Sequence, residues 1–584
     1  MKYFYYLRHN EDIEVMKNPK YYWKETRCER LNNNSCEDKA KVIAMYSYKK
    51  LYFIIKVNKT EFKNNDRAYQ YGDGFNLVLA RPKEEASDEF YVIALSPFNH
   101  GRRVFIWYRN VDFLAQSIEK AEINMSKNGN YTYFSIAIPW EEIKPMNPFE
   151  FKEYGINIAY YEDEDNKLKE YMLRYDPHIQ EENQKRIYDV FKFEEKNAFK
   201  EVEVFATLNK NYGPLGSDFK IQLYINSPKA IDTSIQFNIN SNLHERQLLI
   251  MKGRNKVDFV IAPKHGIIRG NNDFRVNLLE HSFQFKPYAY DRAYIMQMKA
   301  IARNAVGKNP DYKNTLEFLY KNAADTMKKL KSYDDFSVVK EEFLTLENLA
   351  NIGEDNFINK GTVQRMAIKS SFDGELEPYS LYVPKSMKNR GIAGIIITLH
   401  GSGSDDRAAM LNPLNRKLCE DLSLVYAAPK GRGTSNCYCP KEALQDIKDI
   451  TLRLKEVYNT DNVFLEGFSM GGYGVLRVFD YVGELYKGLA IFAGHPNLGP
   501  LFEICNGVDY TKNIGLFKDI PMIAFHGNKD NSCPYEEAAA FYKDIEKVNP
   551  NFNFYTVDGI GHEGLIEEEY NIYRQWLEHN LRFS

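Results

Sequence analysis

A serine inside a glycine-rich turn is the first residue here whose type and surroundings could supply a nucleophile. Ser469 lies in Gly-Phe-Ser-Met-Gly (467–471), after the apolar run 463–465 and before residues 473–479, which can begin a helix. Glycines two positions before and after a serine allow the sharp turn that lifts its hydroxyl clear of a sheet. The bare pattern is common, but a strand before it and a helix after it make it specific. The sequence therefore predicts a nucleophile elbow at Ser469.

Two loops further along the chain supply the base and the acid that such a serine needs. Asp530 follows the apolar run 522–526, and His562 lies in a glycine-rich loop after the run 552–557. The order serine, acid, histidine is the one that sites of this kind use. Asp558 is a rival acid, but it lies only four positions before His562, so we expect it to shape that loop. Ser469, Asp530 and His562 are therefore the predicted catalytic residues.

Backbone amides that could stabilise a negatively charged oxygen are predicted at two positions. Met470, the residue after the nucleophile, supplies one N–H donor, and the loop that ends an earlier apolar run supplies the other at Ser402. His400 precedes the serine in the chain, so we expect it to hold this loop and not to act as the base. His495 and His526 are expected to belong to the scaffold or the pocket wall.

Alternating strand-like and helical runs must position these residues. From about residue 360 to the end, short apolar runs of the kind buried on both faces of a sheet are separated by stretches that can form covering helices, such as 442–458. The apolar runs are 394–399, 423–428, 463–467, 488–492 and 522–526. Ser469, Asp530 and His562 all follow strand ends, where α/β sheets carry their sites. We therefore predict a parallel α/β domain over 360–584.

The rest of the chain divides into three segments with other patterns. Residues 1–195 contain strand-length β-branched or aromatic runs between polar turns, which predicts a β-sandwich. Residues 196–287 alternate apolar and polar residues and are expected to form a second, smaller β-sandwich. Residues 288–359 are rich in helix-forming residues, so a helical connector is expected there. The clearest predicted strands are 50–57, 74–79, 90–95, 131–138, 219–225 and 257–261.

Length and charge limit what the whole chain can be. A chain of 584 residues corresponds to about four domains of ~150 residues, so a multidomain protein is expected. The formal net charge of −3 is too close to neutral for the basic surface that binds nucleic acid. No uninterrupted apolar run reaches the ~18 residues of a membrane-spanning helix. Neither nucleic acid nor a membrane is expected as a partner.

The cysteines and the first residues bear on cofactors and on the cellular compartment. Seven cysteines are an odd number and form no C-x-x-C pair, which argues against a complete disulfide framework and against a structural zinc site. The apolar stretch 3–7 is too short for a secretory signal. A cytoplasmic location is therefore the default expectation, and a secreted one if a leader has been removed. No metal or other cofactor is expected.

Aromatic residues are unusually frequent, at 14% of the chain, with 42 Tyr and 37 Phe but only 4 Trp. Most of them are expected in strands, because aromatic side chains pack well on a half-buried pleated surface. Trp107 and Tyr108 could stack on a sugar ring, although packing in a core is the simpler role.

Several motifs of the last segment together resemble one family of enzymes. They are Ser-Phe-Asp-Gly at 371–374 with 378–384, then 429–433, then Glu442 and Asp446, and finally 466–474. This block resembles the esterase branch of the α/β-hydrolases, near feruloyl esterases, acetyl xylan esterases and related predicted peptidases. The resemblance implies an α/β-hydrolase fold over 360–584 and serine carboxylesterase activity. Residues 436–439 depart from the family, in which an aromatic residue often lies near the pocket.

The first segment more loosely resembles a family 9-like carbohydrate-binding module. The matching stretches are Tyr22 with Trp23, 51–57 and 71–79. These are largely framework positions, so the resemblance implies the β fold more strongly than sugar binding.

Together these observations predict a serine carboxylesterase that hydrolyses carbohydrate-linked esters, feruloyl or acetyl, through an acyl-enzyme. The expected partners are a carbohydrate ester or another small ester at the catalytic site and a polysaccharide on the first segment. One alternative is a serine peptidase of the prolyl-oligopeptidase type, although no propeller-blade repeat of ~40–50 residues is visible in the N-terminal half. The other is a carbohydrate-binding protein with an inactive hydrolase domain, against which the intact set of Ser469, Asp530 and His562 argues.

Overall fold

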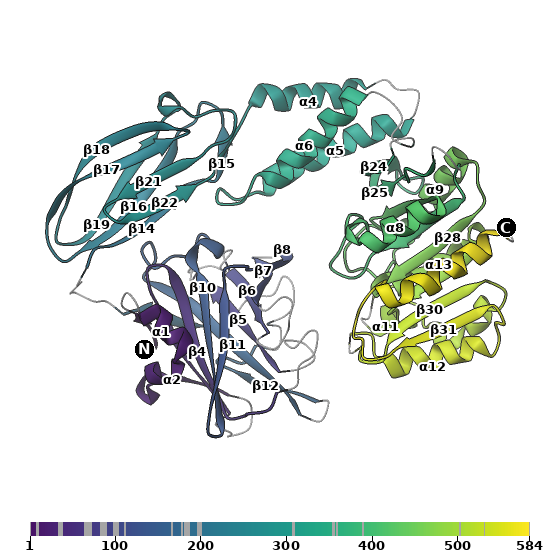
Figure 1. The fold of residues 1–584 in the computed structure, drawn as a ribbon, viewed down its shortest axis with the longest axis horizontal. Helices are drawn as coiled ribbons and strands as arrows, with labels where there is room; N and C mark the ends of the chain where they lie inside the picture. Colours follow the sequence, from purple (N-terminus) through teal and green to yellow (C-terminus); the bar gives the residue numbers. More distant parts are fainter. Residues whose placement is uncertain are drawn as a thin grey trace. The chain divides into compact units, whose positions relative to one another are not determined.

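The computed structural model divides the chain into two compact units (Figure 1). The first unit comprises Met1–Arg292 and Leu330–Phe336, and the second comprises Ala293–Lys329 and Ser337–Ser584. The described residues are 2–7, 11–32, 39–62, 73–81, 90–96, 104–109, 112–164, 167–176, 179, 187–194, 201–305, 310–352, 357, 360–387, 391–501, 504–530 and 532–582.

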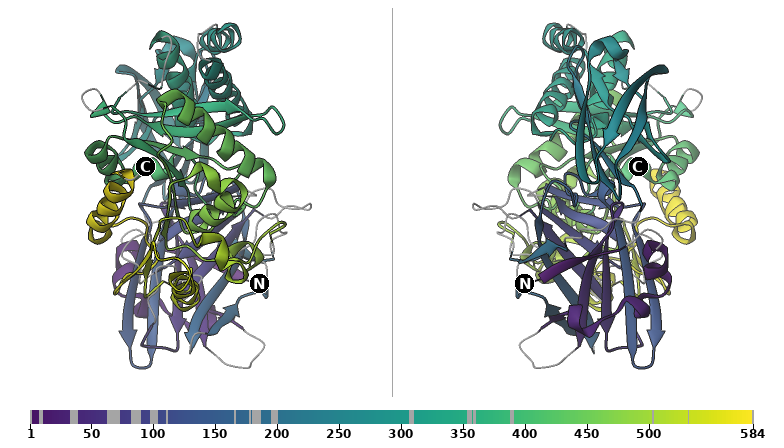
Figure 2. Two further views of the ribbon diagram at one scale, coloured as in Figure 1. Left: turned by 90° about the vertical axis from the view of Figure 1, so that its right-hand side faces the viewer. Right: turned by 90° about the vertical axis from the view of Figure 1, so that its left-hand side faces the viewer.

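Thirteen strands of the described residues form one hydrogen-bonded sheet in the first unit, and its long strands run side by side in both views of Figure 2. The order is β8-β7-β6-β5-β11-β13-β1-β3-β4-β10-β9, with β12 beside β11 and β2 beside β3. The strands are β1 (Lys2–Tyr6), β2 (Glu29–Leu31), β3 (Ala40–Tyr46), β4 (Lys50–Val57), β5 (Gly74–Ala80), β6 (Phe90–Leu95), β7 (Val104–Arg109), β8 (Asp112–Ser117), β9 (Glu122–Asn128), β10 (Tyr131–Pro139), β11 (Glu153–Glu164), β12 (Lys167–Met172) and β13 (Asp189–Phe193). Two short helices, α1 (Glu11–Lys17) and α2 (Pro19–Tyr22), follow β1. Strands therefore occupy all four runs predicted for this segment.

The first strand joins the two halves of this sheet. β1 pairs in parallel with β13 through its first residues and with β3 through its last residues. A simple β-sandwich has two separate sheets, whereas β1 connects the two halves of this sheet. Side chains from both halves share one core, in which the ring of Phe75 on β5 lies 5.0 Å from the ring of Phe134 on β10. Other fully buried rings of this unit include those of Trp140, Tyr52, Tyr154, Tyr160, Tyr161 and Tyr171.

The aromatic residues that could bind sugar are described only in part. The side chains of Trp107 and Tyr108 lie outside the described residues, and so do residues 71–72 of the stretch that resembles a carbohydrate-binding module. Trp23 is described and half-buried, and its ring lies 5.8 Å from the ring of Tyr133 on β10. Trp23 therefore packs against the sheet that follows it.

A second β region follows in the same unit. It contains the sheets β14-β16-β19, β18-β17-β21-β22 and β15-β23-β20. The strands are β14 (Glu203–Leu208), β15 (Tyr212–Pro214), β16 (Phe219–Ser227), β17 (Ile231–Ile239), β18 (Asn242–Ile250), β19 (Gly253–Ile261), β20 (Gly270–Asn271), β21 (Phe274–Leu278), β22 (His281–Phe285) and β23 (Tyr288–Tyr290). The sheets β14-β16-β19 and β18-β17-β21-β22 share one core, in which the rings of Phe219 and Phe274 lie 5.5 Å apart.

The helical segment does more than connect. Its helices are α4 (Arg292–Asn304), α5 (Pro310–Lys329) and α6 (Ser337–Ile352), and residues 288–290, expected to begin the connector, are strand β23 instead. The amide of Ala367 donates to Thr315 Oγ1 on α5 at 3.0 Å, and Asp311 on α5 pairs with Arg453 at 2.6 Å. Helix α5 therefore packs on the α/β sheet of the second unit as a covering helix.

Eight strands form the sheet of the second unit, in the order β24-β25-β27-β26-β28-β29-β30-β31. They are β24 (Val363–Lys369), β25 (Leu376–Tyr382), β26 (Gly394–Leu399), β27 (Leu424–Pro429), β28 (Val463–Phe468), β29 (Gly488–Phe492), β30 (Met522–Gly527) and β31 (Phe552–Val557). The predicted apolar runs form the parallel strands from β27 to β31 in this order, whereas β24 and β25, which precede those runs, form an antiparallel hairpin that also pairs antiparallel with β27. A hairpin needs no crossover helix, so it can extend the edge of a parallel sheet in this way.

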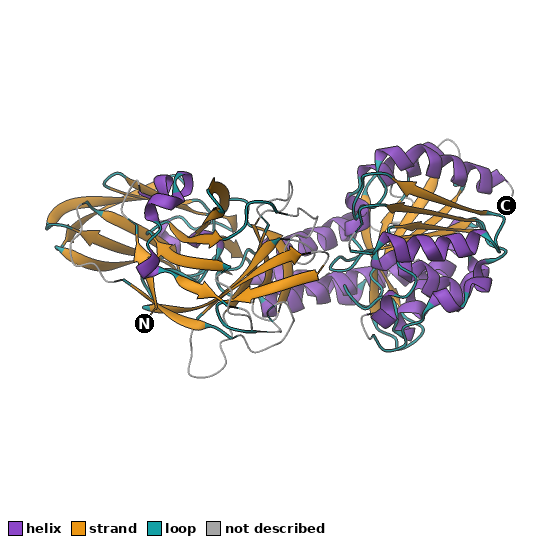
Figure 3. Ribbon diagram, turned by 90° about the horizontal axis from the view of Figure 1, so that it is seen from below, coloured by secondary structure: helices purple, strands orange, loops and turns teal. Residues whose placement is uncertain are grey.

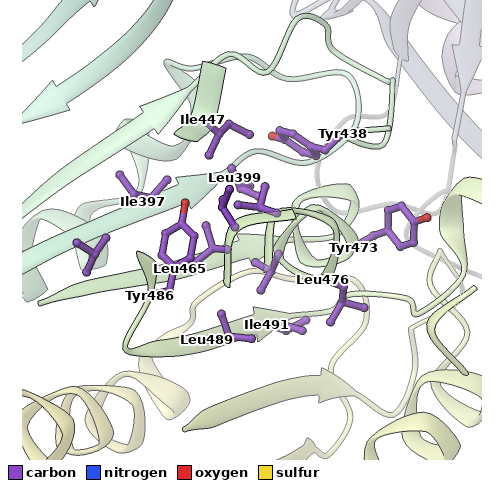
Figure 4. Close-up of a cluster of buried hydrophobic side chains, with 14 of the residues drawn as sticks. Ile397, Leu399, Tyr438, Ile447, Leu465, Tyr473, Leu476, Tyr486, Leu489 and Ile491 are labelled. Carbon is purple, nitrogen blue, oxygen red and sulfur yellow. The ribbon is translucent and has the colours of Figure 1, made fainter. Parts of the chain in front are cut away.

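Helices cover both faces of this sheet (Figure 3). Helices α8 (Pro413–Leu422) and α13 (Glu567–Arg582) pack on one face, and α9 (Lys441–Tyr458), α10 (Met470–Val482) and α12 (Tyr535–Glu546) pack on the other. Figure 4 shows the core between this sheet and helices α9 and α10. Leu465 and Leu489 of the strands are buried there in one cluster with Ile447 of α9 and Leu476 of α10. This is the α/β-hydrolase-like arrangement. None of the helices in the described part of the chain is long and apolar enough to cross a membrane.

Candidate active site

The turn between β28 and α10 holds Ser469 in a backbone conformation that few residues adopt. Its φ is 56° and its ψ is −118°, a kind of strain that is found at functional sites. A Cβ on Gly467 would lie 2.1 Å from the carbonyl oxygen of Gly471, and a Cβ on Gly471 would lie 2.0 Å from the carbonyl oxygen of Leu399. Both positions therefore require glycine, as a nucleophile elbow does.

The structure brings Ser469, His562 and Asp530 within hydrogen-bond distance of one another. His562 Nε2 lies 2.7 Å from Ser469 Oγ, and His562 Nδ1 lies 2.7 Å from Asp530 Oδ2. Asp530 is 3% exposed and Ser469 is 9% exposed, so the contacts are largely shielded from water. A neutral imidazole whose Nδ1–H donates to the carboxylate leaves Nε2 free to accept the serine hydroxyl proton. The arrangement can therefore activate Ser469 for attack on a carbonyl carbon.

Asp530 is surrounded by hydrogen-bond donors. Its Oδ1 accepts the amides of Ser532 and Cys533 at 2.8 and 2.9 Å, and its Oδ2 faces His562 and His526. Burial by itself raises the pKa of Asp530, but the hydrogen bonds from His526 and His562, and the charge of His562, hold that pKa below its usual range. Asp530 therefore remains ionised beside the base.

Asp558, the rival acid, has a different partner. Its Oδ1 accepts Asn528 Nδ2–H at 2.9 Å, and the amide of Gly559 donates to Asn528 Oδ1 at 2.8 Å. Asp558 thus shapes the loop that leads to His562.

The two expected oxyanion donors lie at the ends of neighbouring strands. β26 and β28 are parallel partners, with Leu399 beside Gly467 in the register, so the loop with Ser402 and the turn with Met470 leave the same edge of the sheet. Among the described residues, neither the amide of Ser402 nor that of Met470 donates a hydrogen bond inside the protein. Both N–H groups therefore lack an acceptor in the described part of the protein.

A strained loop holds these donors in place. Cys437 and Tyr438 both have a φ of 52°, a left-handed conformation that is uncommon for such side chains. The amide of Cys437 donates to the sulfur of Met470 at 3.4 Å, and the hydroxyl groups of Ser435 and Ser402 lie 2.9 Å apart. Residues 436–439, at which the sequence departs from the family block, therefore contact the residue after the nucleophile.

The remaining histidines have distinct roles. The ring nitrogens of His400 each lie 2.9 Å from a carbonyl oxygen, those of Gly401 and Lys430, so His400 ties two loops together. His495 Nε2 lies 3.1 Å from a carboxylate oxygen of Glu537. His526 is expected to belong to the scaffold or the pocket wall, and its Nε2 lies 3.2 Å from Oδ2 of Asp530. Only its position four residues before Asp530 could have signalled this contact from the sequence.

Arg432 lies in the sequence block that resembles esterases, and it binds two other residues of that block, Asp373 and Asp446. Its guanidinium pairs with Asp373 at 2.7 Å, with Glu377 at 3.2 Å and with Asp446 on α9. Burial raises the pKa of Glu377 to about 7, although Arg432 opposes this effect. The cluster therefore fastens the hairpin β24–β25 to α9.

Across the described residues, no group of three or more His, Cys, Asp or Glu side chains is arranged to hold a metal ion.

Comparison with known proteins finds a family match for the region around the site. Residues 440–579 match the phospholipase/carboxylesterase family, and this stretch contains Ser469, Asp530 and His562. No curated protein matches the chain.

Similar solved structures include an S-formylglutathione hydrolase, Est1E and a ferulic acid esterase. An S-formylglutathione hydrolase from Agrobacterium tumefaciens is 14% identical over 39% of this chain and 97% of that chain, with a TM-score of 0.31. Est1E from Butyrivibrio proteoclasticus is 16% identical over 37% of this chain and 96% of that chain, with a TM-score of 0.30. A ferulic acid esterase is 13% identical over 38% of this chain and 99% of that chain, with a TM-score of 0.31.

The matched family and the contacts among serine, histidine and aspartate define the class of protein. The chain is a serine hydrolase of the carboxylesterase type.

Proposed function

We propose that Ser469 is the nucleophile, that His562 is the base and that Asp530 orients His562. The Ser469 oxygen bonds to the carbonyl carbon of the ester while its proton moves to His562 Nε2. The tetrahedral intermediate then collapses, His562 gives the proton to the departing alcohol, and the acyl group stays on Ser469. A water molecule that loses its proton to the same nitrogen attacks the acyl-enzyme. When the second intermediate collapses, its bond to Ser469 Oγ breaks, His562 returns the proton to that oxygen, and the acid is released.

The single observation that supports this mechanism best is the unbroken chain of contacts from Ser469 Oγ through His562 to Asp530, with both distances at 2.7 Å. The free amides of Met470 and Ser402 would then donate to the oxygen that becomes negatively charged. Preorganised donors of this kind stabilise the intermediate without the reorientation that water would need.

We further propose that the substrates are carbohydrate-linked esters, feruloyl or acetyl. The sequence block 429–474, with its resemblance to feruloyl and acetyl xylan esterases, supports this substrate class. Arg432 and Asp446 of that block form the ion cluster beneath the hairpin, so the resemblance includes residues that build the domain as well as the elbow.

A substrate panel tests the proposal. Methyl ferulate, acetylated xylan, p-nitrophenyl acetate and a prolyl peptide are assayed with the full chain and with Ser469→Ala. We expect hydrolysis of the esters, at least about a thousandfold lower with Ser469→Ala, and no cleavage of the peptide. If Ser469→Ala is as active as the wild type, Ser469 is not the nucleophile. If only the p-nitrophenyl ester is hydrolysed, carbohydrate-linked esters are not the substrates.

Residues 1–195 are proposed to hold the polysaccharide. The support is their β architecture and the loose resemblance of Tyr22, Trp23 and 51–57 to a carbohydrate-binding module. The full-length Ser469→Ala protein should be depleted from solution by insoluble xylan, and a soluble xylo-oligosaccharide should reverse the depletion. If a chain that lacks residues 1–195 is depleted equally well, these residues do not hold the polysaccharide.

The peptidase alternative has less support. The described strands before α4 form sheets of thirteen, three, three and four strands, and not a ring of four-stranded blades. The cap that a prolyl-oligopeptidase uses is therefore not formed by these strands.

A further inference from the structure

Two imidazole rings face the same oxygen of Asp530, and the proposed mechanism uses only one of them. His562 Nδ1 lies 2.7 Å from Asp530 Oδ2, and His526 Nε2, from the end of β30, lies 3.2 Å from that same atom. His526 Nε2 also lies 2.8 Å from the carbonyl oxygen of Cys533. The side chains of His526 and Asp530 are both 0% exposed.

The surroundings of His526 determine which of its nitrogens carries hydrogen. A carbonyl oxygen can only accept, so Nε2 must be the donor to Cys533. The other nitrogen, Nδ1, is buried and has no hydrogen-bond partner among the described residues. A hydrogen on Nδ1 would be a buried donor without an acceptor, which is costly. His526 therefore donates from Nε2, whose N–H is shared between Cys533 and Asp530.

With His526 included, the carboxylate of Asp530 has a full set of donors. Oδ1 accepts the amides of Ser532 and Cys533, and Oδ2 accepts the N–H groups of His562 and His526. A carboxylate offers about four acceptor positions, so this set fixes the plane of the group as well as its charge. The rings of Tyr535 and Tyr542 lie 6.0 and 6.4 Å from the ring of His526 and limit its movement.

We propose that His526 is a positioning residue for hydrolysis: its Nε2–H ties Asp530 and the Cys533 carbonyl to the end of β30, so that Oδ2 is presented to His562. This role rests on the proposed functions of Ser469, His562 and Asp530. Without the donor, Oδ2 loses one of its two partners and the carbonyl of Cys533 loses the hydrogen bond that anchors its turn. The carboxylate can then rotate away from His562, which would slow the proton transfer and leave substrate binding unchanged.

Three substitutions of His526 distinguish the loss of its Nε2–H donor from the loss of the ring's volume. The amide of a glutamine reaches the place of Nε2, whereas the amide of an asparagine reaches only the place of Nδ1, and leucine has no donor. With p-nitrophenyl acetate, His526→Asn and His526→Leu should lower kcat by about tenfold to a hundredfold, the effect expected for one hydrogen bond to a charged group, with KM within about twofold. His526→Gln should recover most of the lost kcat. If the leucine variant does not fold, the comparison of asparagine with glutamine still decides the question.

A double-mutant cycle tests whether His526 acts through Asp530. Because His526 has little to position once the carboxylate is gone, adding His526→Asn to Asp530→Asn should lower kcat by less than about twofold. A role in packing alone predicts that the two losses multiply and that glutamine and asparagine are equally impaired, and either result would overturn the proposal. Circular dichroism and thermal unfolding confirm that each variant is folded. An inactive wild-type chain, or an active Ser469→Ala variant, would instead refute the proposed function.

Discussion

His562 binds Asp530 across 32 positions of sequence, with 2.7 Å between Nδ1 and Oδ2, although Asp558 lies only four positions away. The order of strands explains this choice. β30 and β31 are parallel neighbours, so the loops that follow them leave the same edge of the sheet and meet there. Asp558 belongs to the start of the His562 loop and accepts Asn528, which leaves the histidine to the acid of the adjacent loop.

The first prediction compares these two acids. Asp530→Asn should lower kcat/KM for p-nitrophenyl acetate by about a thousandfold to ten-thousandfold, because an amide cannot hold the histidine in the required tautomer. Asp558→Asn should stay within about threefold of the wild-type value, since its partner is an asparagine outside the catalytic contacts. Initial rates at several substrate concentrations provide the measurement. A larger loss with Asp558→Asn than with Asp530→Asn would show that the acid is assigned wrongly.

The second prediction concerns the elbow. Gly471→Ala should destabilise the fold by several kcal/mol and abolish activity, because the new methyl group would lie 2.0 Å from the backbone oxygen of Leu399. Gly515→Ala is the matched control, since a Cβ there meets nothing within 4 Å. Urea unfolding followed by circular dichroism should show a lower midpoint for Gly471→Ala alone. Equal midpoints for the two variants would contradict the close approach of α10 to β26.

Local patterns in the sequence were enough to place most strands of the α/β sheet, although not β24 and β25, and the turn at Ser469. Residues 394–399 and 488–492 are predicted from short apolar runs, and β26 and β29 have these same bounds. Strands that are buried on both faces of a sheet are apolar throughout, so their composition alone identifies them as strands. The glycines around Ser469 are likewise local, because a sharp turn and a close helix are set by neighbours in the chain.

Features that depend on contacts between distant segments could not be predicted in this way. Nothing in the composition of 288–359 distinguishes a connector from a covering helix, and the difference appears only in the contact of Thr315 with Ala367. His526 is similar, because an apolar strand that ends in histidine does not reveal which carboxylate the ring will meet. The extra strand β1 that joins two halves of the first sheet is a further case, since strand pairing over long separations has no local signal.

The third prediction tests whether α5 belongs to the catalytic unit. Thr315 is fully buried and its oxygen accepts the amide of Ala367 on β24, so Thr315→Val leaves a buried N–H without an acceptor. We expect a loss of about 1–3 kcal/mol in the free energy of unfolding and a lower temperature for the loss of esterase activity. Thr345→Val on α6 is the control, because Thr345 is exposed and accepts no strand amide. If both variants lose activity at the wild-type temperature, α5 contributes nothing to the catalytic unit.

The last prediction follows from a buried acid near the start of α13. Burial raises the pKa of Glu569 to about 8 from an ordinary value near 4.5, with smaller contributions from Glu568 and Glu563. The folded chain therefore keeps this proton up to about pH 8, whereas the unfolded chain releases it near pH 4.5, so the free energy of unfolding falls as the pH rises between these values. Glu569→Gln removes the titration and should stabilise the protein at pH 8 by on the order of 4 kcal/mol, with little change at pH 4.5. Thermal unfolding across this range is the measurement, and Glu568→Gln, at an exposed neighbour, is the control. A Glu569→Gln curve that runs parallel to the wild-type curve at every pH would contradict the raised pKa.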